Sequence, residues 1–295
     1  MNRKDMTSIA IIADSIACIP KKQAEDYGIK IIPVNILFNG QVYRDVIDLS
    51  SAQAYEFLEK APEFWKSSAA SPDDYLKAYR EISRHAQGIL VVTISSKLSM
   101  FYTSALDAKE IFKDESPQTV VEVIDSETAA AAEGLIALAA ARAVAEGKPF
   151  DEVVAIARKV KERVKFLGLL ETIRYVYRTG RIPKVASEIG SMLSIKPILT
   201  GSKGRIHFAA AARTKQSGIK KMLQIMRNHV GDSEPVRVTV MHADALEEAE
   251  KLKEKVAAEF NCVEIFITDL SPVMGYATGR GTIALAYYKE GSFDK

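Results

Sequence analysis

Gly88–Ala105, with the sequence GILVVTISSKLSMFYTSA, is the most informative stretch of the chain. It opens with the apolar, β-branched run Gly88–Ile94, which is typical of a strand buried on both faces of a sheet. Ser95, Ser96 and Ser99 follow, and a helical pattern starts directly after them. The unpaired N–H groups and the dipole at a helix N-terminus favour an anion there. These residues leave two interpretations of Ser99 open, a helix cap and a ligand contact.

The size and composition of the chain indicate a globular protein of one large or two ordinary domains. The chain has 295 residues, of which 47% are hydrophobic and 26% charged. Its net charge of +2 is too small to indicate a nucleic-acid-binding surface. Cys18 and Cys262 are too far apart in sequence for a metal or redox motif, which favours a reducing compartment. We therefore expect a cytoplasmic protein that does not bind nucleic acid.

No stretch of the sequence predicts a signal peptide or a membrane span. The apolar run Ile9–Ala13, after the charged N-terminus, is too short for a signal-peptide core. The longest apolar stretch, Thr128–Gly147, contains Glu133, Arg142 and Glu146. We expect it to be a packed helix.

The first half of the chain alternates strands with helices, which predicts a mostly parallel sheet covered on both faces. Asn39-Gly40 is a strong turn signal, and Ser71 is the expected cap of the helix after it. Lys66–Pro72 is expected to be a polar loop. The expected strands are Ile9–Ala13, Ile29–Phe38 (one strand or two), Gly88–Ile94 and Thr119–Ile124. The expected helices run from Pro20 to Gly28 and over Ser51–Lys60, Asp73–His85, Thr128–Gly147 and Phe150–Val164.

Three of these strands end in pairs of small polar residues. The pairs are Asp14-Ser15, Ser95-Ser96 and Asp125-Ser126. In open α/β sheets, ligands bind beyond the carboxyl ends of the strands. The sequence therefore predicts a site at this edge of the sheet.

The pattern changes near Lys165, where we place a boundary between domains 1–165 and 166–295. The last helix of the second domain is expected to bury Leu246, Ala249, Val256, Ala257 and Phe260 on one face. The expected strands are Phe166–Leu170, Val236–His242, Cys262–Thr268 and Thr282–Tyr288, with a hairpin over Pro197–Ala212. The expected helices are Glu171–Arg178, Val185–Leu193, Gln216–Val230 and Ala245–Phe260, and Ser271–Gly281 is expected to be a loop.

The sequence lacks the motifs of common nucleotide-binding and hydrolase sites. It has no Walker loop, no Gly-x-Gly-x-x-Gly after a strand and no Gly-x-Ser-x-Gly elbow. His85 and His229 lie in charge-rich predicted helices and are expected to be solvated. His242 and Asp244 have the residue types of a metal-binding pair, although such a pair at a strand end is more often structural.

The strand-end carboxylates and serines offer a second route to catalysis. Asp14 and Asp125 have the chemistry to hold Mg²⁺, but no dense carboxylate cluster surrounds them in the sequence. A catalytic serine needs a general base, and none can be placed beside these serines. The balance favours a ligand-binding protein without a cofactor or a metal, and a metal-dependent small-molecule enzyme is the weaker alternative.

Six motifs follow one another along the chain, namely Ile11–Ser15, Lys66–Ser68, Ser95–Ser99 with Tyr102, Gly180–Ile182, Ile195–Leu199 and Gly279–Thr282. Together they resemble the DegV-type fatty-acid-binding proteins over nearly the whole chain. The resemblance implies a two-domain α/β fold, with an N-terminal mostly parallel αβα sandwich and a C-terminal mixed-sheet α/β domain. It implies a non-catalytic carrier that holds one fatty acid between the domains. In bacteria with a fatty acid kinase, such carriers present the carboxylate for phosphorylation to acyl phosphate.

The resemblance also assigns residues to the carboxylate. Ser67 stands where the family usually has a carboxylate-binding threonine, with Ser68 beside it, and Ser99 aligns with the family's carboxylate-binding serine. Ser96 lies in the same motif as Ser99. Each hydrogen bond to a charged group contributes about 1.5–3 kcal/mol, and each buried methylene about 0.8 kcal/mol. The tail would therefore supply most of the affinity, and the hydroxyls would select which end of the ligand enters.

The implied partners are a fatty acid kinase and, transiently, a membrane. Arg213 aligns with a family arginine implicated in meeting the kinase, and Arg181 lies in the family's Gly-Arg motif. The predicted helix Val185–Leu193 is a candidate for membrane contact. The candidate tail contacts, for each of which plain core packing is the favoured interpretation, are Ile36, Phe38, Leu98, Phe101, Met192, Leu193 and Met274.

The chain departs from the family pattern at three places. Ser67–Ser71 lacks the Gln and Pro of the family loop, and Met100-Phe101 replaces Gly-Thr. Ala277 replaces the histidine of His-x-Gly-Pro-Gly, where Thr278 offers a replacement hydroxyl. These changes favour, as an alternative, a divergent lipid-binding protein without a kinase partner.

Overall fold

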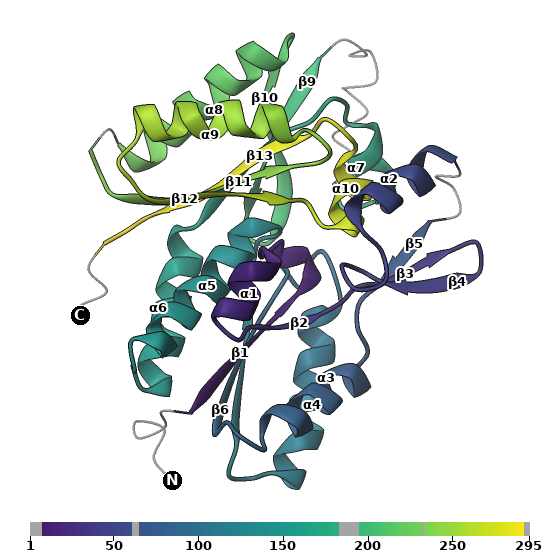
Figure 1. Cartoon of the computed structure of the whole chain (residues 1–295), viewed down its shortest axis with the longest axis vertical. Helices are drawn as coiled ribbons and strands as arrows, with labels where there is room; N and C mark the ends of the chain where they lie inside the picture. Colours follow the sequence, from purple (N-terminus) through teal and green to yellow (C-terminus); the bar gives the residue numbers. More distant parts are fainter. Residues whose placement is uncertain (1–7, 61–64, 183–194, 232, 292–295) are drawn as a thin grey trace.

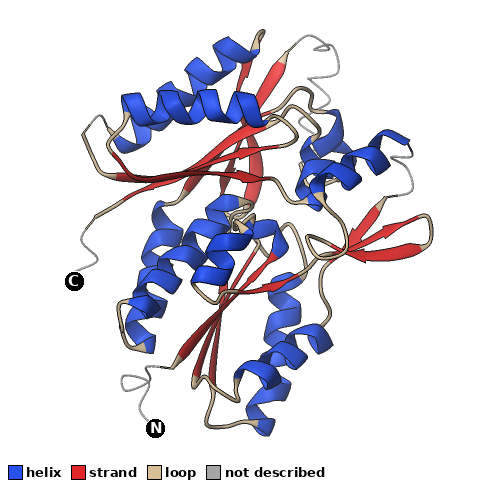
Figure 2. Ribbon diagram, in the orientation of Figure 1, coloured by secondary structure: helices blue, strands red, loops and turns tan. Residues whose placement is uncertain are grey.

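Two β-sheets, each built by one half of the chain, determine the architecture (Figure 1). The protein is described by a computed structural model that covers residues 8–60, 65–182, 195–231 and 233–291. Helices cover the faces of both sheets (Figure 2). The predicted α/β class, with a parallel sheet in the first half and a mixed sheet in the second, is confirmed. The division into domains 1–165 and 166–295 stays a prediction.

The sheet of the first half is entirely parallel. Its strand order is β2-β1-β6-β7. Because successive strand residues face opposite sides, Ile11 and Leu90 enter one core while Ile12 and Ile89 enter another. The strands are β1 (Ile9–Asp14), β2 (Lys30–Ile32), β6 (Gly88–Thr93) and β7 (Val120–Asp125), and the 3₁₀-helix η2 (Ser15–Ala17) follows β1.

The sheet of the second half is mixed. Its strand order is β10-β9-β8-β13-β11-β12, and only β11 and β12 among these neighbours run parallel. The predicted hairpin is present as β9 and β10. The strands are β8 (Lys165–Leu169), β9 (Lys196–Ser202), β10 (Arg205–Ala212), β11 (Val236–His242), β12 (Cys262–Asp269) and β13 (Ile283–Lys289).

The helices arrange the two sheets as layers (Figure 1). α5 and α6 lie between the sheets and share one core with both. α3 and α4 cover the other face of the parallel sheet, and α8 and α9 cover the outer face of the mixed sheet. The helices are α1 (Lys21–Asp26), α2 (Ser51–Lys60), α3 (Pro72–Ile82), α4 (Phe101–Glu115), α5 (Ala131–Ala145), α6 (Phe150–Arg163), α7 (Arg174–Arg178), α8 (Lys215–Val230), α9 (Leu246–Glu259) and α10 (Pro272–Thr278).

The alanine-rich helix α5 is buried along most of its length because both sheets pack on it. Gly134 shows how close this packing is, since a Cβ there would lie 2.4 Å from the carbonyl oxygen of Ala17. Small side chains let the helix fit between the sheets. The predicted packed helix is thereby confirmed. None of the described helices is both long and apolar enough to cross a membrane.

A small third sheet extends from the first half and carries part of the site. Its order is β4-β3-β5, with β3 (Asn35–Phe38), β4 (Gln41–Arg44) and β5 (Lys66–Ser68). Asn39 and Gly40 join β3 to β4 with φ angles of 49° and 77°, the conformation of a two-residue hairpin turn. The prediction of a loop at Lys66–Ser68 was wrong, because these residues pair with β3. A short polar strand at a sheet edge has no hydrophobic alternation to reveal it.

Two further predictions need correction. Most of the predicted loop Ser271–Gly281 is helix α10, which starts with a proline in its first turn. Its Gly275 allows close packing, since a Cβ there would lie 2.4 Å from the Tyr55 hydroxyl. In α9, Leu246 and Ala257 are exposed rather than buried, and Leu252 takes their place in the core. The predicted helix Val185–Leu193 lies outside the described residues.

Candidate ligand-binding site

A cavity of about 460 Å³ lies where residues of the mixed sheet and the small third sheet meet residues that follow strands of the parallel sheet and residues of α4, α7 and α10. This volume is within the usual range for small-molecule sites. Residues 129 and 130, at the N-terminus of α5, line the cavity, so it lies in the layer between the two large sheets. Both halves of the chain therefore contribute to its wall, as the resemblance implied.

The wall of the cavity is mainly apolar. Leu98, Phe101 and Met274 line it, whereas Ile36 and Phe38 belong to the core beside α3 and α4. The contact of the first three with a ligand tail stays a prediction. Met192 and Leu193 lie outside the described residues. The other large apolar lining residues are Ile16, Val34, Ile94, Phe166, Leu170, Val176, Leu199, Ile206, Met241, Leu270 and Val273. None of these residues was predicted as a ligand contact, because they come from many different elements and look like ordinary core in the sequence.

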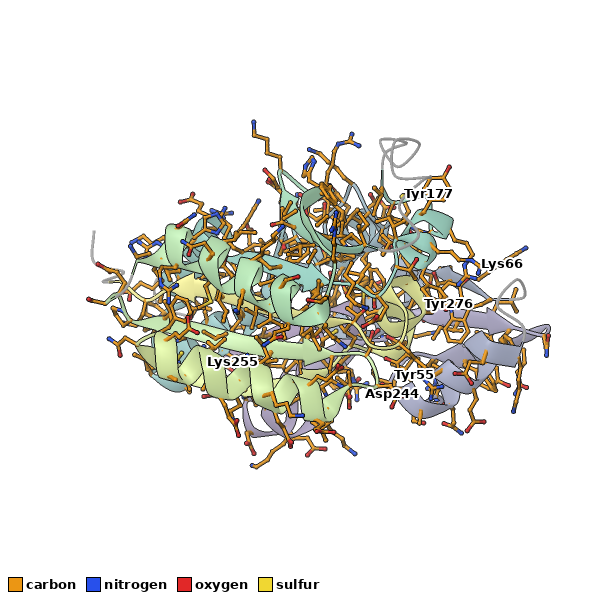
Figure 3. The ribbon with its side chains drawn as sticks, turned by 90° about the horizontal axis from the view of Figure 1, so that it is seen from above. Tyr55, Lys66, Tyr177, Asp244, Lys255 and Tyr276 are labelled. Atoms are coloured by element: carbon orange, nitrogen blue, oxygen red, sulfur yellow. The ribbon has the colours of Figure 1, made fainter. Side chains whose placement is uncertain are left out.

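The cavity opens through a polar mouth, a name we use for five residues. They are Lys66, Ser67, Ser68, Arg178 and Arg181, the exposed residues among the described lining. Lys66 and Tyr276 lie on the same side of the molecule, next to the three-stranded sheet (Figure 3). The wall behind the mouth is buried or half-buried. A ligand that enters here meets polar and cationic groups first.

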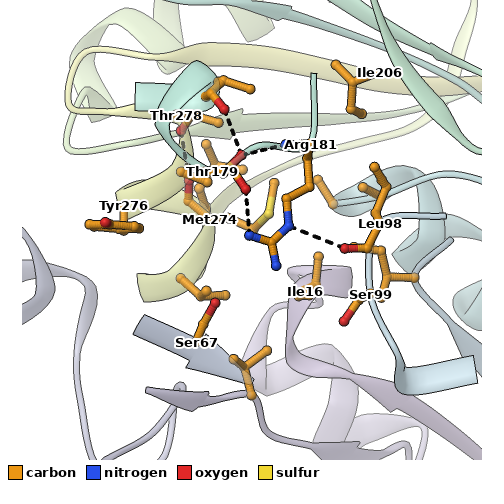
Figure 4. A pocket seen from close by; sticks show the side chains of 18 of the residues that line it. Ile16, Ser67, Leu98, Ser99, Thr179, Arg181, Ile206, Met274, Tyr276 and Thr278 are labelled. Carbon is orange, nitrogen blue, oxygen red and sulfur yellow. Dashed lines mark hydrogen bonds between the residues drawn. The ribbon is translucent and has the colours of Figure 1, made fainter. Parts of the chain in front are cut away.

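Two serines face the space inside the mouth. Ser67, on β5, and Ser99, before α4, lie on opposite sides of the pocket below the Arg181 guanidinium (Figure 4). Neither hydroxyl has a hydrogen-bond partner among the described residues. Both are therefore free to donate to a ligand.

The cap interpretation of Ser99 is wrong. The N-cap of α4 is Met100, and no side chain caps this helix. The Ser99 amide donates to the Ser95 carbonyl, which leaves its hydroxyl available to the cavity.

Ser96 and Thr278 are placed differently from the two free serines. Ser96 is not among the residues that line the cavity, because its hydroxyl and amide both donate to Asp125. Thr278 lines the cavity, but its hydroxyl donates to the Met274 carbonyl at 2.9 Å. Thr278 can therefore offer a ligand an acceptor but not its proton.

The charge at the mouth is entirely positive. Lys66, Arg178 and Arg181 line the cavity, and no Asp or Glu does so in the described part of the chain. Arg181 donates to the carbonyls of Thr179 at 2.8 Å and Leu98 at 3.4 Å, and its guanidinium points into the pocket (Figure 4). None of the three cations pairs with a carboxylate of the described residues. Unpaired cations around a cavity attract an anionic group.

An aromatic stack forms one side of the mouth. The rings of Trp65 and Tyr276 are parallel within 12° and 4.9 Å apart, and the Arg178 guanidinium lies 4.7 Å from the centre of the Tyr276 ring. This stack joins the segment before β5 to α10 and α7. Sequence reasoning missed all three residues. The single tryptophan directly before Lys66–Ser68 was the one available signal.

The loop that carries Ser99 is held by the buried Asp14. The Asp14 carboxylate accepts the amides of Ile94 at 2.9 Å and Ile16 at 3.0 Å. Burial raises the pKa of Asp14 to about 7. Because its oxygens already accept amide protons, Asp14 serves the structure of the site rather than a metal. In the described part of the chain, no three His, Cys, Asp or Glu side chains converge as a metal site requires.

The side chains of His242 and Asp244, the candidate metal pair, contact different partners. The His242 imidazole lies 3.3 Å from the Asp269 carboxylate, whereas Asp244 pairs with Arg280 at 2.8 Å. Arg280 also pairs with Glu59 of α2 and lies over the ring of Tyr55. Arg280, which departs from the family pattern, thus links α2 to the mixed sheet.

Arg213 lies apart from the cavity. It is exposed in the connection between β10 and α8 and is not among the lining residues. Its assignment to a partner surface stays a prediction.

The fold and the cavity define an α/β protein with two large sheets and an internal, mainly apolar cavity. Comparison with known proteins narrows this class. Residues 8–290 match a family model described as "Uncharacterised protein, DegV family". The chain belongs to the DegV family. A DegV domain-containing protein of Clostridium perfringens is 31% identical over 283 residues, which cover 96% of this chain and 99% of that protein.

Solved structures of DegV proteins share the fold along their whole length. A DegV family protein from Thermus thermophilus, described by its fatty acid binding, has a TM-score of 0.89 at 25% identity and covers 96% of this chain and 100% of its own. DegV from Bacillus subtilis, described as a fatty acid binding protein, has a TM-score of 0.85 at 26% identity, with coverage of 97% and 100%. A DegV family protein from Ruminococcus gnavus, described with vaccenic acid, has a TM-score of 0.87 at 25% identity, with coverage of 96% and 100%.

Proposed function

We propose that the protein binds one long-chain fatty acid in the cavity, with the carboxylate at the polar mouth and the tail against the apolar wall. The observation that carries this proposal is the distribution of charge around the cavity. Every charged residue of the described lining is a cation, and all of them lie at the mouth. An amphiphile with one anionic end and an apolar body matches this distribution. The fatty acids named for related DegV proteins support the same ligand class.

The carboxylate is expected to bind between Ser67 and Ser99. Both hydroxyls are free donors, and the Arg181 guanidinium points into the space between them (Figure 4). Phe101, the first residue of α4, also lines the cavity, so the N-terminal end of that helix, which favours an anion, lies at the cavity wall. These donors compensate the carboxylate for the water it loses.

The tail is expected to supply most of the affinity. Each methylene that leaves water contributes about 0.8 kcal/mol. The side chains that line the cavity behind the mouth are apolar apart from hydroxyl groups and the Trp65 indole N–H. No general base lies beside Ser67 or Ser99 in the described lining, which supports binding without chemical conversion.

We further propose that the protein acts in the cytoplasm as a carrier for a fatty acid kinase. Ser67 and Ser68 are exposed at the mouth, so a bound carboxylate is accessible to a partner. Arg213, exposed before α8, is the candidate partner contact. The competing proposal is a lipid-binding protein without a kinase. It is favoured by Ala277, which supplies no donor, and by Thr278, whose proton is already donated to Met274.

Native mass spectrometry of the purified protein tests the ligand class. We expect one bound species whose mass is that of a long-chain fatty acid, released on denaturation. A polar ligand, or a protein that takes up no fatty acid after delipidation and reloading, would contradict the proposal. Incubation of the loaded protein with ATP and the fatty acid kinase of the host then distinguishes the carrier with a kinase partner from the carrier without one. Acyl phosphate formation supports the kinase partnership, and its absence supports the carrier without one.

A further inference from the structure

Glu133 is a completely buried acid in the first turn of α5, between the two large sheets. Asp14, which is also completely buried, ends β1, the strand against which α5 packs, and its carboxyl group interacts with that of Glu133. Neither residue lines the cavity. A buried pair of acids next to a site is unusual, because each charge loses its hydration. The burial of these two acids next to the cavity therefore requires a structural explanation.

Asp14 holds two segments of the cavity wall in place. Its carboxylate accepts the Ile94 amide at 2.9 Å and the Ile16 amide at 3.0 Å. Ile16 and Ile94 both line the cavity, and Ser99 follows Ile94 in the same loop. Asp14 is fully buried, so the two amides replace the water that its charge would otherwise have. A change in Asp14 would therefore move residues that contact the ligand.

Glu133 can satisfy its hydrogen bonds only as a neutral acid. Neither of its carboxyl oxygens receives a donor from the described residues. An ionised Glu133 would be a buried, unpaired charge next to the Asp14 charge, which is strongly unfavourable. A protonated Glu133 is itself a donor, and Asp14 is the acceptor beside it. Above the pKa of Asp14, about 7, one proton remains on the two acids and the charge lies on Asp14, where two amides bind it.

We propose that Glu133 is a positioning residue: its neutral carboxylic acid donates to Asp14 and so keeps the Ile16 and Ile94 segments in the geometry that binds the ligand. This inference rests on the proposed function as far as ligand affinity is concerned. It also predicts that the site loosens at alkaline pH, when the shared proton is lost and two carboxylates face each other.

The groups around the pair favour retention of the proton. Asp45, Asp125, Tyr75 and Cys18 act on one or both acids, and none of these four is a cation. Burial raises the pKa of Glu133 well above its usual range. A folded-state pKa above the unfolded value means that this group's contribution to stability is complete below its usual pKa. That contribution falls as the pH rises towards the folded-state pKa.

Substitution of Glu133 by glutamine distinguishes the effect of the hydrogen bond to Asp14 from the effect of losing a proton. Glu133→Gln keeps a donor to Asp14 and cannot lose a proton, whereas Glu133→Leu removes the donor. Glu146→Gln, on the exposed C-cap of the same helix, is the matched control. The dissociation constant for oleic acid, measured by titration calorimetry from pH 6.5 to 9, is compared among the four proteins. Because all four bind the same ligand, its own ionisation cancels in their ratios.

The expected result is a ratio of wild-type to Glu133→Gln dissociation constants that rises about tenfold over this range, the effect of one pKa unit. Glu146→Gln should follow the wild type, and Glu133→Leu should bind at least several-fold more weakly at pH 7. A ratio that stays constant with pH would overturn the inference. Wild-type affinity in Glu133→Leu would overturn it as well.

A measurement without ligand keeps the test independent of folding defects and of the proposed function. The melting temperature of Glu133→Gln minus that of the wild type should increase steadily from pH 5 to pH 9. Amide exchange at Ile94 in the wild type should accelerate over the same range relative to Glu133→Gln. If both changes occur in a protein that binds no oleic acid, the inference about Glu133 stands and the proposed function fails. If oleic acid binds but both changes are absent, the inference fails and the proposed function stands.

Discussion

The two free serines at the mouth provide a direct test of how the head group is bound. Ser67→Ala and Ser99→Ala each remove one hydroxyl that has no partner among the described residues. Neither change should unfold the protein, because no internal hydrogen bond of these hydroxyls is lost. The apolar wall and the cations remain in place. The substitutions therefore act on the carboxylate alone.

The size of the effect follows from the strength of a hydrogen bond to a charged group. At about 1.5–3 kcal/mol for each bond, each single variant should bind oleic acid roughly 10- to 150-fold more weakly. The double variant should lose about 10²–10⁴-fold if the two bonds act independently. Oleyl alcohol, which has the same tail without the charge, should be affected much less. The ratio of acid to alcohol affinity is therefore the most informative quantity.

Titration calorimetry with both ligands measures this ratio. Ser233→Ala, an exposed serine in the loop before β11, serves as the matched control and should behave like the wild type. A double variant that binds oleic acid within twofold of the wild type would refute the proposed head-group site. A parallel loss for acid and alcohol would instead show that the substitutions damage the tail site.

Three other variants test the rest of the site. Arg181→Met should weaken oleic acid binding about tenfold and reduce its dependence on salt, because it removes a cation at the mouth; calorimetry at two ionic strengths decides this. Ala284→Phe should fill part of the cavity and shift the bound fatty acids towards shorter chains. Mass spectrometry of the extracted lipid measures this shift, and an unchanged chain-length profile would exclude Ala284 from the tail site. Gly134→Ala should destabilise the fold by about 2 kcal/mol or more, because its Cβ would lie 2.4 Å from the backbone oxygen of Ala17. This clash should outweigh the better helix propensity of alanine. Equal melting temperatures for the variant and the wild type would contradict this packing.

Local signals in the sequence predicted the elements that are built from strong patterns. The predicted bounds of Ser51–Lys60 and Val236–His242 match α2 and β11. Ser71 caps α3 in a capping box with Asp74, as its position before a proline indicated. In these segments, hydrophobic period and end signals lie within a few residues of one another. The bounds of these elements could therefore be predicted without knowledge of tertiary contacts.

The parts of the site that escaped prediction depend on contacts between distant segments. Trp65 stacks on Tyr276, and Arg178 lies over the same ring. Asp14 binds the Ile94 amide, and the two residues are 80 positions apart. The family resemblance assigned Ser67 and Ser99 to one ligand, and the structure brings both to one cavity. The resemblance did not predict the buried pair of Glu133 and Asp14.

Helix α5 explains why the cavity and the acid pair occur together. A helix between two sheets must be thin, and α5 meets this need with alanine and glycine along most of its length. Such a helix offers few side chains that can hold the surrounding strand ends in place. Glu133, in its first turn, is the long polar side chain that reaches the end of β1, and it is buried because both sheets close over it. The same packing that buries α5 therefore also favours retention of the proton on the acids beside the cavity wall.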